Sequence, residues 1–350
     1  MRSALSTVKG VRALQSLNPL ACPKGLKHSC ELCGKTARFF CSSCKVTHYC
    51  SEEHYSLDQD SIHNLICHLL HELRRPCTAA TTALQRKEHD CKIKEIQVKL
   101  IEVCRNQATT FLNSRQFNKA IPPSLQVLNL SVSVFGNHSL QLVPAFMLLG
   151  EASLGLGNTG FAREYLSLAS WILSQHVHGK TRSDLQKVVD NEEDSSTILT
   201  TVLPVNDLRA RLSLLFGKLA ISEENTSEAI NHFAESVYFT SLHYGSVSSI
   251  TAIPYFHLGS TYLKLKDYAK VDSFYLLVLN TWKVFLEDAQ KSNQNDGSTG
   301  DAPLIVTIIG ESQFAEIDSL LNSINNYYSN QDASQDKSNL ARYVLGLLYS

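Results

Sequence analysis

Apolar residues past position 92 follow a helical period, and one pattern of small and large residues recurs among them. Each copy has a small residue, an often aromatic residue three positions later, a small residue twelve later and usually an apolar residue sixteen later. The copies are Ala108, Phe111, Ala120, Ser124; Gly150, Ser153, Ala162, Leu166; Gly217, Ala220, Ala229, Phe233; and Gly259, Tyr262, Val271, Tyr275. A small residue lets two helices approach closely while a larger one fills the adjacent space. The pattern predicts repeated antiparallel helical hairpins; a plain amphipathic bundle is the alternative.

The distances between copies predict where the repeats are interrupted. The small residues at 108, 150, 217 and 259 are 42, 67 and 42 positions apart, so the middle interval is longer by 67 − 42 = 25 residues. A polar stretch at about 178–206 accounts for the difference and is predicted to be a loop between repeats. Gly346 lies 346 − 259 = 87 positions after Gly259, nearly two repeat lengths. Residues 303–350 are therefore predicted to be a further helical repeat, incomplete at the C-terminus.

Cysteine and histidine residues fall in four pairs within one short segment. The pairs are Cys30 and Cys33, Cys41 and Cys44, Cys50 and His54, and His63 and Cys67. Two thiolates separated by two residues can reach one ion from a tight turn, and a separation of three residues puts two ligands on one face of a helical turn. Eight such donors fill two tetrahedral zinc sites and leave no open position, which predicts structural zinc and no catalytic residues.

Other histidines and cysteines leave part of this assignment open. His48, His68 and His71 lie close enough in sequence to replace His54 or His63 as ligands. The cysteines outside the paired pattern are predicted to be core thiols. They are Cys22, Cys77, Cys91 and Cys104.

Composition and charge narrow the classes of partner and compartment. The 350 residues include 32 basic and 33 acidic side chains, a net charge of −1, so the chain has no basic surplus for binding nucleic acid. The sequence shows neither an apolar run long enough for a membrane span nor the apolar core of a secretory signal, which predicts an intracellular, reducing location. Residues 1–29 are basic and are predicted to form a flexible arm; a mitochondrial presequence is the alternative.

The order of the zinc ligands, with the Tyr49-Cys50-Ser51 triplet, resembles the MYND zinc finger. The resemblance implies that the first and third pairs hold one ion and the second and fourth pairs hold the other. Two departures stand out: His54 occupies a position where the family has cysteine, and His63 comes one residue later than usual. MYND fingers as a family bind short proline-containing peptides. The equal alternative here is a finger that only caps the domain after it.

The helical pattern resembles the tetratricopeptide repeat, most clearly in its fourth copy, and the 42-residue spacing resembles the kinesin-light-chain-like branch. Repeats of this kind bind other proteins. The positions that clamp chaperone carboxylates in one subclass are Arg105, Met147 and Phe256, of which only the first is polar. A SET-and-MYND lysine methyltransferase would need a β-rich catalytic segment, for which residues 1–29 and 68–92 are too short.

These parts predict a mainly α-helical chain with a zinc finger at 30–67, a connecting helix at 68–92 and helical repeats at 93–290. Together with the segments 120–122 and 142–157, this order resembles a family of axonemal proteins from cilia and sperm flagella. The resemblance implies a non-enzymatic scaffold or assembly factor in the cytoplasm and the ciliary or flagellar cytoskeleton. Its implied partners are another tetratricopeptide protein and dynein-associated components. The alternative is a cytoplasmic adaptor or co-chaperone.

Overall fold

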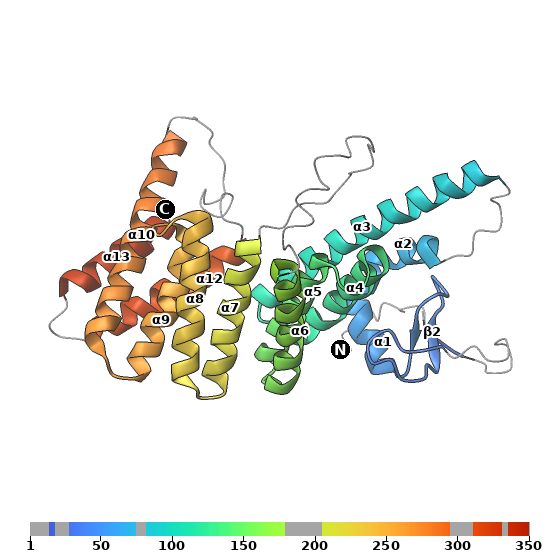
Figure 1. Ribbon diagram of the computed structural model, residues 1–350, viewed down its shortest axis with the longest axis horizontal. Coiled ribbons are helices and arrows are strands. Elements are labelled where there is room, and N and C mark those ends of the chain that lie inside the picture. Colours follow the sequence, from blue (N-terminus) through green and yellow to red (C-terminus); the bar gives the residue numbers. More distant parts are fainter. Residues whose placement is uncertain are drawn as a thin grey trace, which may run out of the picture. The chain divides into compact units, whose positions relative to one another are not determined.

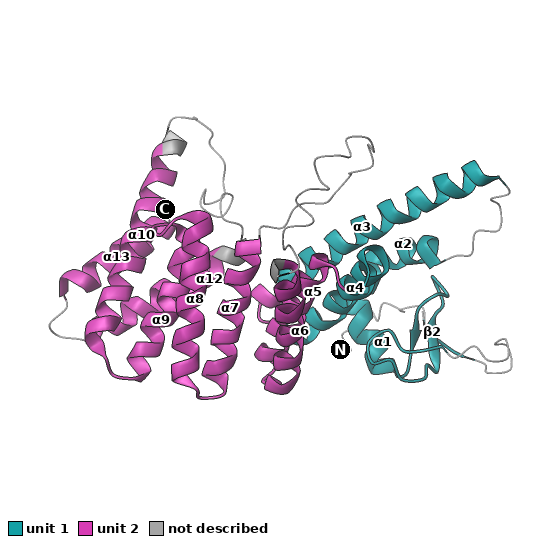
Figure 2. Ribbon diagram, in the orientation of Figure 1, with its two compact units in different colours: residues 1–111, 117–137 teal, residues 112–116, 138–350 magenta. Residues whose placement is uncertain are grey.

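The computed structural model describes residues 14–17, 28–74, 82–178, 205–294, 311–330 and 335–349. The chain divides into two compact units, coloured separately in Figure 2. The first consists of residues 1–111 and 117–137, and the second of residues 112–116 and 138–350. None of the described helices is both long enough and apolar enough to cross a membrane.

The first unit contains a small antiparallel sheet. Its strands, in spatial order, are β1 (Leu14–Ser16), β2 (Phe39–Cys41) and β3 (His48–Tyr49). Leu14 is paired with Cys41, and the pairing extends one step further because the backbone N–H of Leu17 donates to the carbonyl of Arg38 at 2.7 Å. Residues 14–17, which lie in the predicted N-terminal arm, therefore form an edge strand of the metal-binding region.

Helices follow the sheet and complete the first unit. They are α1 (Glu52–Asp58), a π-helix η2 (Gln59–His63), α2 (Asn64–Arg74), α3 (Ala83–Asn113) and α4 (Phe117–Phe135). Helix α3 contains no glycine or proline to interrupt it. The boundary predicted at 92–93, between a connecting helix and the first repeat, therefore lies inside one continuous helix.

Helix α4 packs against α1 and η2, so the metal-binding region and the first helical hairpin share one unit. Side chains reinforce this packing around Glu31. Arg74 forms an ion pair with the Glu31 carboxylate, and Gln126 of α4 donates to Glu31 Oε2 at 3.2 Å. Both partners of Glu31 are distant in sequence, and Gln126 is buried.

The second unit consists of helical hairpins packed side by side (Figure 1). A short 3-10 helix, η3 (Leu140–Leu142), precedes them. The hairpins are α5 (Val143–Gly155) with α6 (Thr159–His178), α7 (Val205–Ser222) with α8 (Thr226–Tyr244), α9 (Ser249–Lys264) with α10 (Tyr268–Gln294), and α12 (Glu311–Ser329) with α13 (Gln335–Tyr349). The predicted fold class, mainly α with a zinc-binding region and packed helical hairpins, is confirmed.

The repeated small residues lie where paired helices approach most closely. A β-carbon added to Gly150, Gly217 or Gly259 would lie 2.7, 2.3 or 2.6 Å from a side chain of the second helix. In each hairpin that side chain is the large residue sixteen positions later: Leu166, Phe233 and Tyr275. The residues at the twelfth position, Ala120, Ala162, Ala229 and Val271, are all 0% exposed. The recurring pattern thus corresponds to a recurring contact between helices.

The turns inside the hairpins also recur at one position of the pattern. Seven residues after each small residue, the backbone enters the left-handed region at Arg115, Gly157, Glu224 and Lys266, with φ between 57° and 76°. In the last three turns the next residue donates its N–H to the carbonyl five positions earlier, as Asn158 does to Ser153. This hydrogen bond closes the end of the first helix in a Schellman-like arrangement.

The C-terminal segment does not follow the template. An added β-carbon on Gly346 would meet nothing within 4 Å, and α13 packs against both α12 and α10. Its apolar side chains Ala341, Val344 and Leu348 join the core formed with those helices. Helix α13 is therefore the second helix of a hairpin with α12, and Gly346 does not occupy the small-residue position of the template. The predicted polar loop at 178–206 lies mainly outside the described residues.

Candidate metal centre

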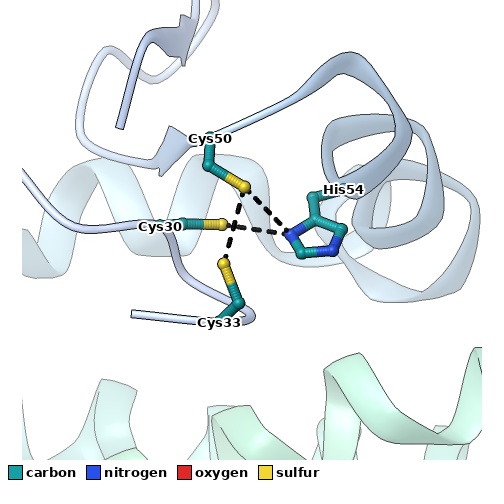
Figure 3. A group of neighbouring side chains, drawn as sticks. All are labelled: Cys30, Cys33, Cys50 and His54. Carbon is teal, nitrogen blue, oxygen red and sulfur yellow. Dashed lines mark hydrogen bonds between the residues drawn. The ribbon is translucent and has the colours of Figure 1, made fainter. Parts of the chain in front are cut away.

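The first group of predicted ligands comes from a tight turn, a strand end and a helix start. Cys30 and Cys33 lie on a turn closed by the Gly34 N–H, which donates to the Cys30 carbonyl at 3.0 Å; Gly34 has a φ of 67°. Cys50 follows β3. His54 lies in the first turn of α1, where the Ser51 hydroxyl caps its backbone N–H at 3.3 Å. Figure 3 shows the three sulfur atoms and one ring nitrogen converging.

The second group is built in a similar way. Cys41 ends β2, and Lys45, with a φ of 61°, donates its N–H to the Cys41 carbonyl at 2.8 Å, so Cys41 and Cys44 lie on the same kind of turn as the first pair. His63 ends η2 and Cys67 lies in the first turn of α2. The Nε2 atom of His63 lies 3.7 Å from Cys44 Sγ.

Both groups fit a tetrahedral zinc ion. Within each group, one ligand atom per residue lies within 4.8 Å of every other. In the first group, His54 Nδ1 is 3.4 Å from Cys30 Sγ and 3.3 Å from Cys50 Sγ, and Cys33 Sγ is 3.5 Å from Cys50 Sγ. Zinc–sulfur bonds of about 2.3 Å place two sulfurs about 3.8 Å apart at a tetrahedral ion. Three thiols and one imidazole are also a donor set that selects zinc. The two groups therefore fit two zinc ions.

The structure brings all eight predicted ligands together in two groups, in the interleaved pairing that the resemblance implied. Cys30, Cys33, Cys50 and His54 form one group, and Cys41, Cys44, His63 and Cys67 form the other. Nearby histidines have different contacts. The His48 ring stacks on His28 at 4.0 Å, and His71 Nδ1 lies 2.8 Å from the Cys44 carbonyl, to which it can donate; His68 is exposed.

The Cys41 and Cys44 thiols of the second group shift each other's pKa in opposite directions. Their mutual hydrogen bond raises the pKa of Cys41 and lowers the pKa of Cys44 to about 2, and the His63 and Thr47 side chains contribute further to the lowering. The Thr47 hydroxyl lies 3.0 Å from Cys44 Sγ. Because the thiolate is the form that ligates zinc, metal binding displaces the thiol protons of this group.

The π-helix explains how the one-residue departure before His63 is accommodated. Residues 59–63 form a single π-helical segment between α1 and α2. A π-helical turn holds one more residue than an α-helical turn of similar length, and such turns occur often at functional sites. The extra residue is taken up within the helix, and His63 still faces its group.

Comparison with known proteins agrees with this geometry. The MYND finger family model matches residues 30–67. These residues form a MYND finger. A segment of programmed cell death protein 2 from Rattus norvegicus is 48% identical to this chain over 40 residues. That segment is 11% of this chain and 12% of the rat protein, so the similarity concerns a small part of each.

The cysteines outside the four ligand pairs differ in how deeply they are buried. Cys104 of α3 is 0% exposed, and burial raises the pKa of its thiol to about 12, as expected for a core cysteine. Cys91 is exposed, because it lies in the charged N-terminal half of α3, so its prediction as a core thiol is wrong. Cys22 and Cys77 lie outside the described residues.

Two buried residues of the MYND finger beside the ligand groups, Tyr49 and Asp58, were not predicted from the sequence. Asp58 is 1% exposed, and its Oδ2 accepts a hydrogen bond from the Tyr49 hydroxyl at 2.7 Å. Burial raises the pKa of Asp58 to about 6, and burial together with the Asp58 charge raises the pKa of Tyr49. An aspartate in a helix is expected to be exposed, so no local sequence pattern predicts that Asp58 is buried while Asp60 is exposed.

The second unit contains a cavity of about 240 Å³ between α7, α8 and α9. It is lined by Lys218, Ile221, Phe233, His257, Ser260, Thr261 and Lys264. The His257 ring stacks on Phe233 at 5.1 Å. Burial and the Lys218 charge lower the pKa of His257 to about 3, so the imidazole is neutral at physiological pH. Lys218 contacts Glu151 of α5 at 3.4 Å, so its charge is partly compensated within the unit.

Proposed function

We propose that this chain is a non-enzymatic scaffold or assembly factor that binds other proteins. A MYND finger indicates a role in protein–protein interaction, and a fold of packed helical hairpins is consistent with a non-catalytic interaction module. The observation that carries the proposal is the completeness of both metal groups. Each supplies four protein donors, which leaves no coordination position for a substrate.

The finger itself is proposed to act as a structural staple. Capture of a peptide as an added strand needs an exposed sheet edge. Here β2 is paired with β3 on one side and with β1, from the same chain, on the other. Helix α4 also packs against α1 and η2. These contacts favour a finger that stabilises the first helical hairpin over one that takes up a proline-containing peptide along β2.

The protein-binding surface is proposed to lie on α6. Phe161, Leu168 and Trp171 are 59%, 46% and 46% exposed, and their spacing puts them along one face of the helix. Large exposed apolar side chains that share a face mark sites of protein association more often than scattered ones do. The partner proposed for this face is another helical-repeat protein that presents an apolar helix surface.

The proposed setting is the axoneme of cilia or flagella. The order of a MYND finger and tetratricopeptide-like hairpins resembles zinc finger MYND domain-containing protein 12, which implies association with another tetratricopeptide protein and with dynein machinery. Support comes from the recurring close contacts at Gly150, Gly217 and Gly259, the last two of which are 42 residues apart. A cytoplasmic adaptor or co-chaperone is the alternative. The described strands are three short ones in the first unit. Because a SET-and-MYND methyltransferase needs a β-rich catalytic segment, this favours the axonemal scaffold and the adaptor over such an enzyme.

Proximity labelling in ciliated cells tests this proposal. The full chain is expected to label axonemal and dynein-associated proteins, and the double variant Phe161→Ala, Trp171→Ala is expected to lose a large part of that labelling. Tyr238→Ala, which truncates an equally exposed aromatic residue of α8, is the matched control. A set of labelled nuclear corepressors would contradict the proposal, and a set dominated by chaperones would favour the co-chaperone alternative.

A further inference from the structure

Asp58 is a buried carboxylate with few partners. It ends α1 and is 1% exposed. Among the described residues, its Oδ2 accepts from the Tyr49 hydroxyl at 2.7 Å and lies 3.7 Å from His63 Nδ1, whereas its Oδ1 has no hydrogen-bond partner. A buried carboxylate that is incompletely hydrogen-bonded is costly, so its position calls for a physical reason.

The His63 ring faces this carboxylate with the nitrogen that the metal group does not use. Its Nε2 lies 3.7 Å from Cys44 Sγ, within the second ligand group. Its Nδ1 is buried and also lacks a hydrogen-bond partner among the described atoms. An imidazole that offers Nε2 to a metal carries its proton on Nδ1. A donor without a partner therefore faces, at 3.7 Å, the Asp58 oxygen Oδ2, which accepts from Tyr49 and can accept a second hydrogen bond.

We propose that Asp58 is the positioning residue of the second zinc site. Its carboxylate accepts the Nδ1–H of His63, fixes the tautomer in which Nε2 is free to ligate, and sets the ring orientation. With zinc held by the second group, the Nδ1–H of His63 would donate to Oδ2, which lies 3.7 Å away in this structure. Tyr49 holds the carboxylate in place, because its buried phenol keeps its proton and donates it.

This arrangement also links the metal site to the helices around it. Helix α1 thus contributes to both groups: His54 belongs to the first, and Asp58 faces His63 of the second. Loss of the Asp58 carboxylate is expected to weaken the second site selectively. The first group is an internal reference for any measurement on the second.

Zinc competition on the full chain tests the proposal. Asp58→Asn keeps the size of the side chain but offers a neutral amide, and one of the two zinc ions is expected to bind about 10–100-fold more weakly. The other ion should keep its affinity. Asp60→Asn, at an exposed acid two residues away, is the matched control and should behave as the unmodified protein. Unchanged affinity at both sites in Asp58→Asn would overturn the proposal.

A measurement on the unmodified protein keeps the proposal testable if Asp58→Asn does not fold. Nitrogen-15 NMR of the zinc-loaded chain is expected to show His63 protonated at Nδ1, with a proton that exchanges slowly and is shifted downfield by a hydrogen bond. A purely structural role for Asp58 would not require this signature. A His63 proton on Nε2, or an Nδ1 proton in rapid exchange with water, would refute the assignment.

Discussion

The ring of Phe233 occupies the space that a β-carbon on Gly217 would need, 2.3 Å away, and Gly150 and Gly259 have equivalent contacts. Glycine is required at these positions because any added atom must displace a packed group of the facing helix. Single residues also determine the geometry of the MYND finger, where His54 brings Nδ1 within 3.4 Å of two thiols.

Gly217→Ala is expected to destabilise the second unit by about 1–3 kcal/mol, because the new methyl group overlaps a buried aromatic ring. Urea unfolding followed by tryptophan fluorescence measures the change, since both tryptophans, Trp171 and Trp282, lie in this unit. Gly346→Ala, in a helix with open space around the added atom, is the control and should not lower the free energy of unfolding. Equal stability of the two variants would contradict the close-contact interpretation.

His54→Cys is expected to retain two zinc ions per chain, because a thiolate is an equivalent tetrahedral donor. His54→Ala is expected to lose tight binding of one ion, because its group keeps only three donors. Metal analysis after dialysis against a moderate chelator distinguishes the two. If the alanine variant also kept both ions with unchanged affinity, His54 would not be a ligand.

At the scale of elements, turns and helix irregularities hold the ligands and hairpins in register. Of the four hairpin turns that the structure describes, three place a non-glycine residue in the left-handed region, and the turn between α5 and α6 uses Gly157. The π-helix η2 has a corresponding role in the finger, since it takes up one residue without turning His63 away.

Gly157→Ala is expected to destabilise the hairpin of α5 and α6 by about 1 kcal/mol, because a β-carbon is strained at a φ of 76°. Gly160→Ala lies three residues away, inside α6, with nothing near the added atom, and should be neutral or slightly stabilising. Thermal unfolding of the two variants gives the comparison. A Gly157→Ala variant as stable as Gly160→Ala would show that the turn tolerates the side chain.

The second unit is expected to lose stability below neutral pH, in part through His257. Its pKa of about 3 in the folded chain lies below the ordinary value of 6.5, so between these values the unfolded state binds the extra proton. The stability contribution is therefore full above pH 6.5 and declines as the pH falls toward 3. Urea midpoints at pH 4.5 and 7.5 should differ less in His257→Gln than in the unmodified chain. An exposed residue, His243, provides the control His243→Gln.

At the scale of the whole molecule, metal binding and helical packing belong to different units. All eight ligands lie in the first unit, whereas the cores formed by α7–α10 and by α10, α12 and α13 lie in the second. Metal ligation supplies on the order of 10 kcal/mol per structural zinc, so the finger is expected to unfold without it.

Chelation of zinc is expected to remove hydrogen-exchange protection from residues 30–74 and to reduce it in α4, which packs on the finger. Protection of the second unit and the urea midpoint of its tryptophan fluorescence should not change. Mass spectrometry of exchanged peptides, with and without chelator, makes the comparison directly. A chelator-dependent shift of the tryptophan midpoint would mean that the second unit depends on the metal.

The eight ligands and the helical hairpins could be predicted because both require residues of fixed type at regular spacings in the sequence. Ligand pairs must be close in sequence to share a turn, and a helix pair must repeat its small and large residues at fixed offsets. The positions 150 and 166, 217 and 233, and 259 and 275 illustrate this, since the same offset of sixteen produced the same contact three times.

Contacts between distant segments were decided by the tertiary structure alone. Nothing in the local sequence brings Leu14 to Cys41 or Gln126 to Glu31, and the charged surroundings of Cys91 were no guide to the burial of Cys104. Burial and pairing of these residues depend on which surfaces meet after folding. Spacing specifies which residues can share a turn or a helix face, whereas the packing of one element on another determines which polar groups lose water and must find partners.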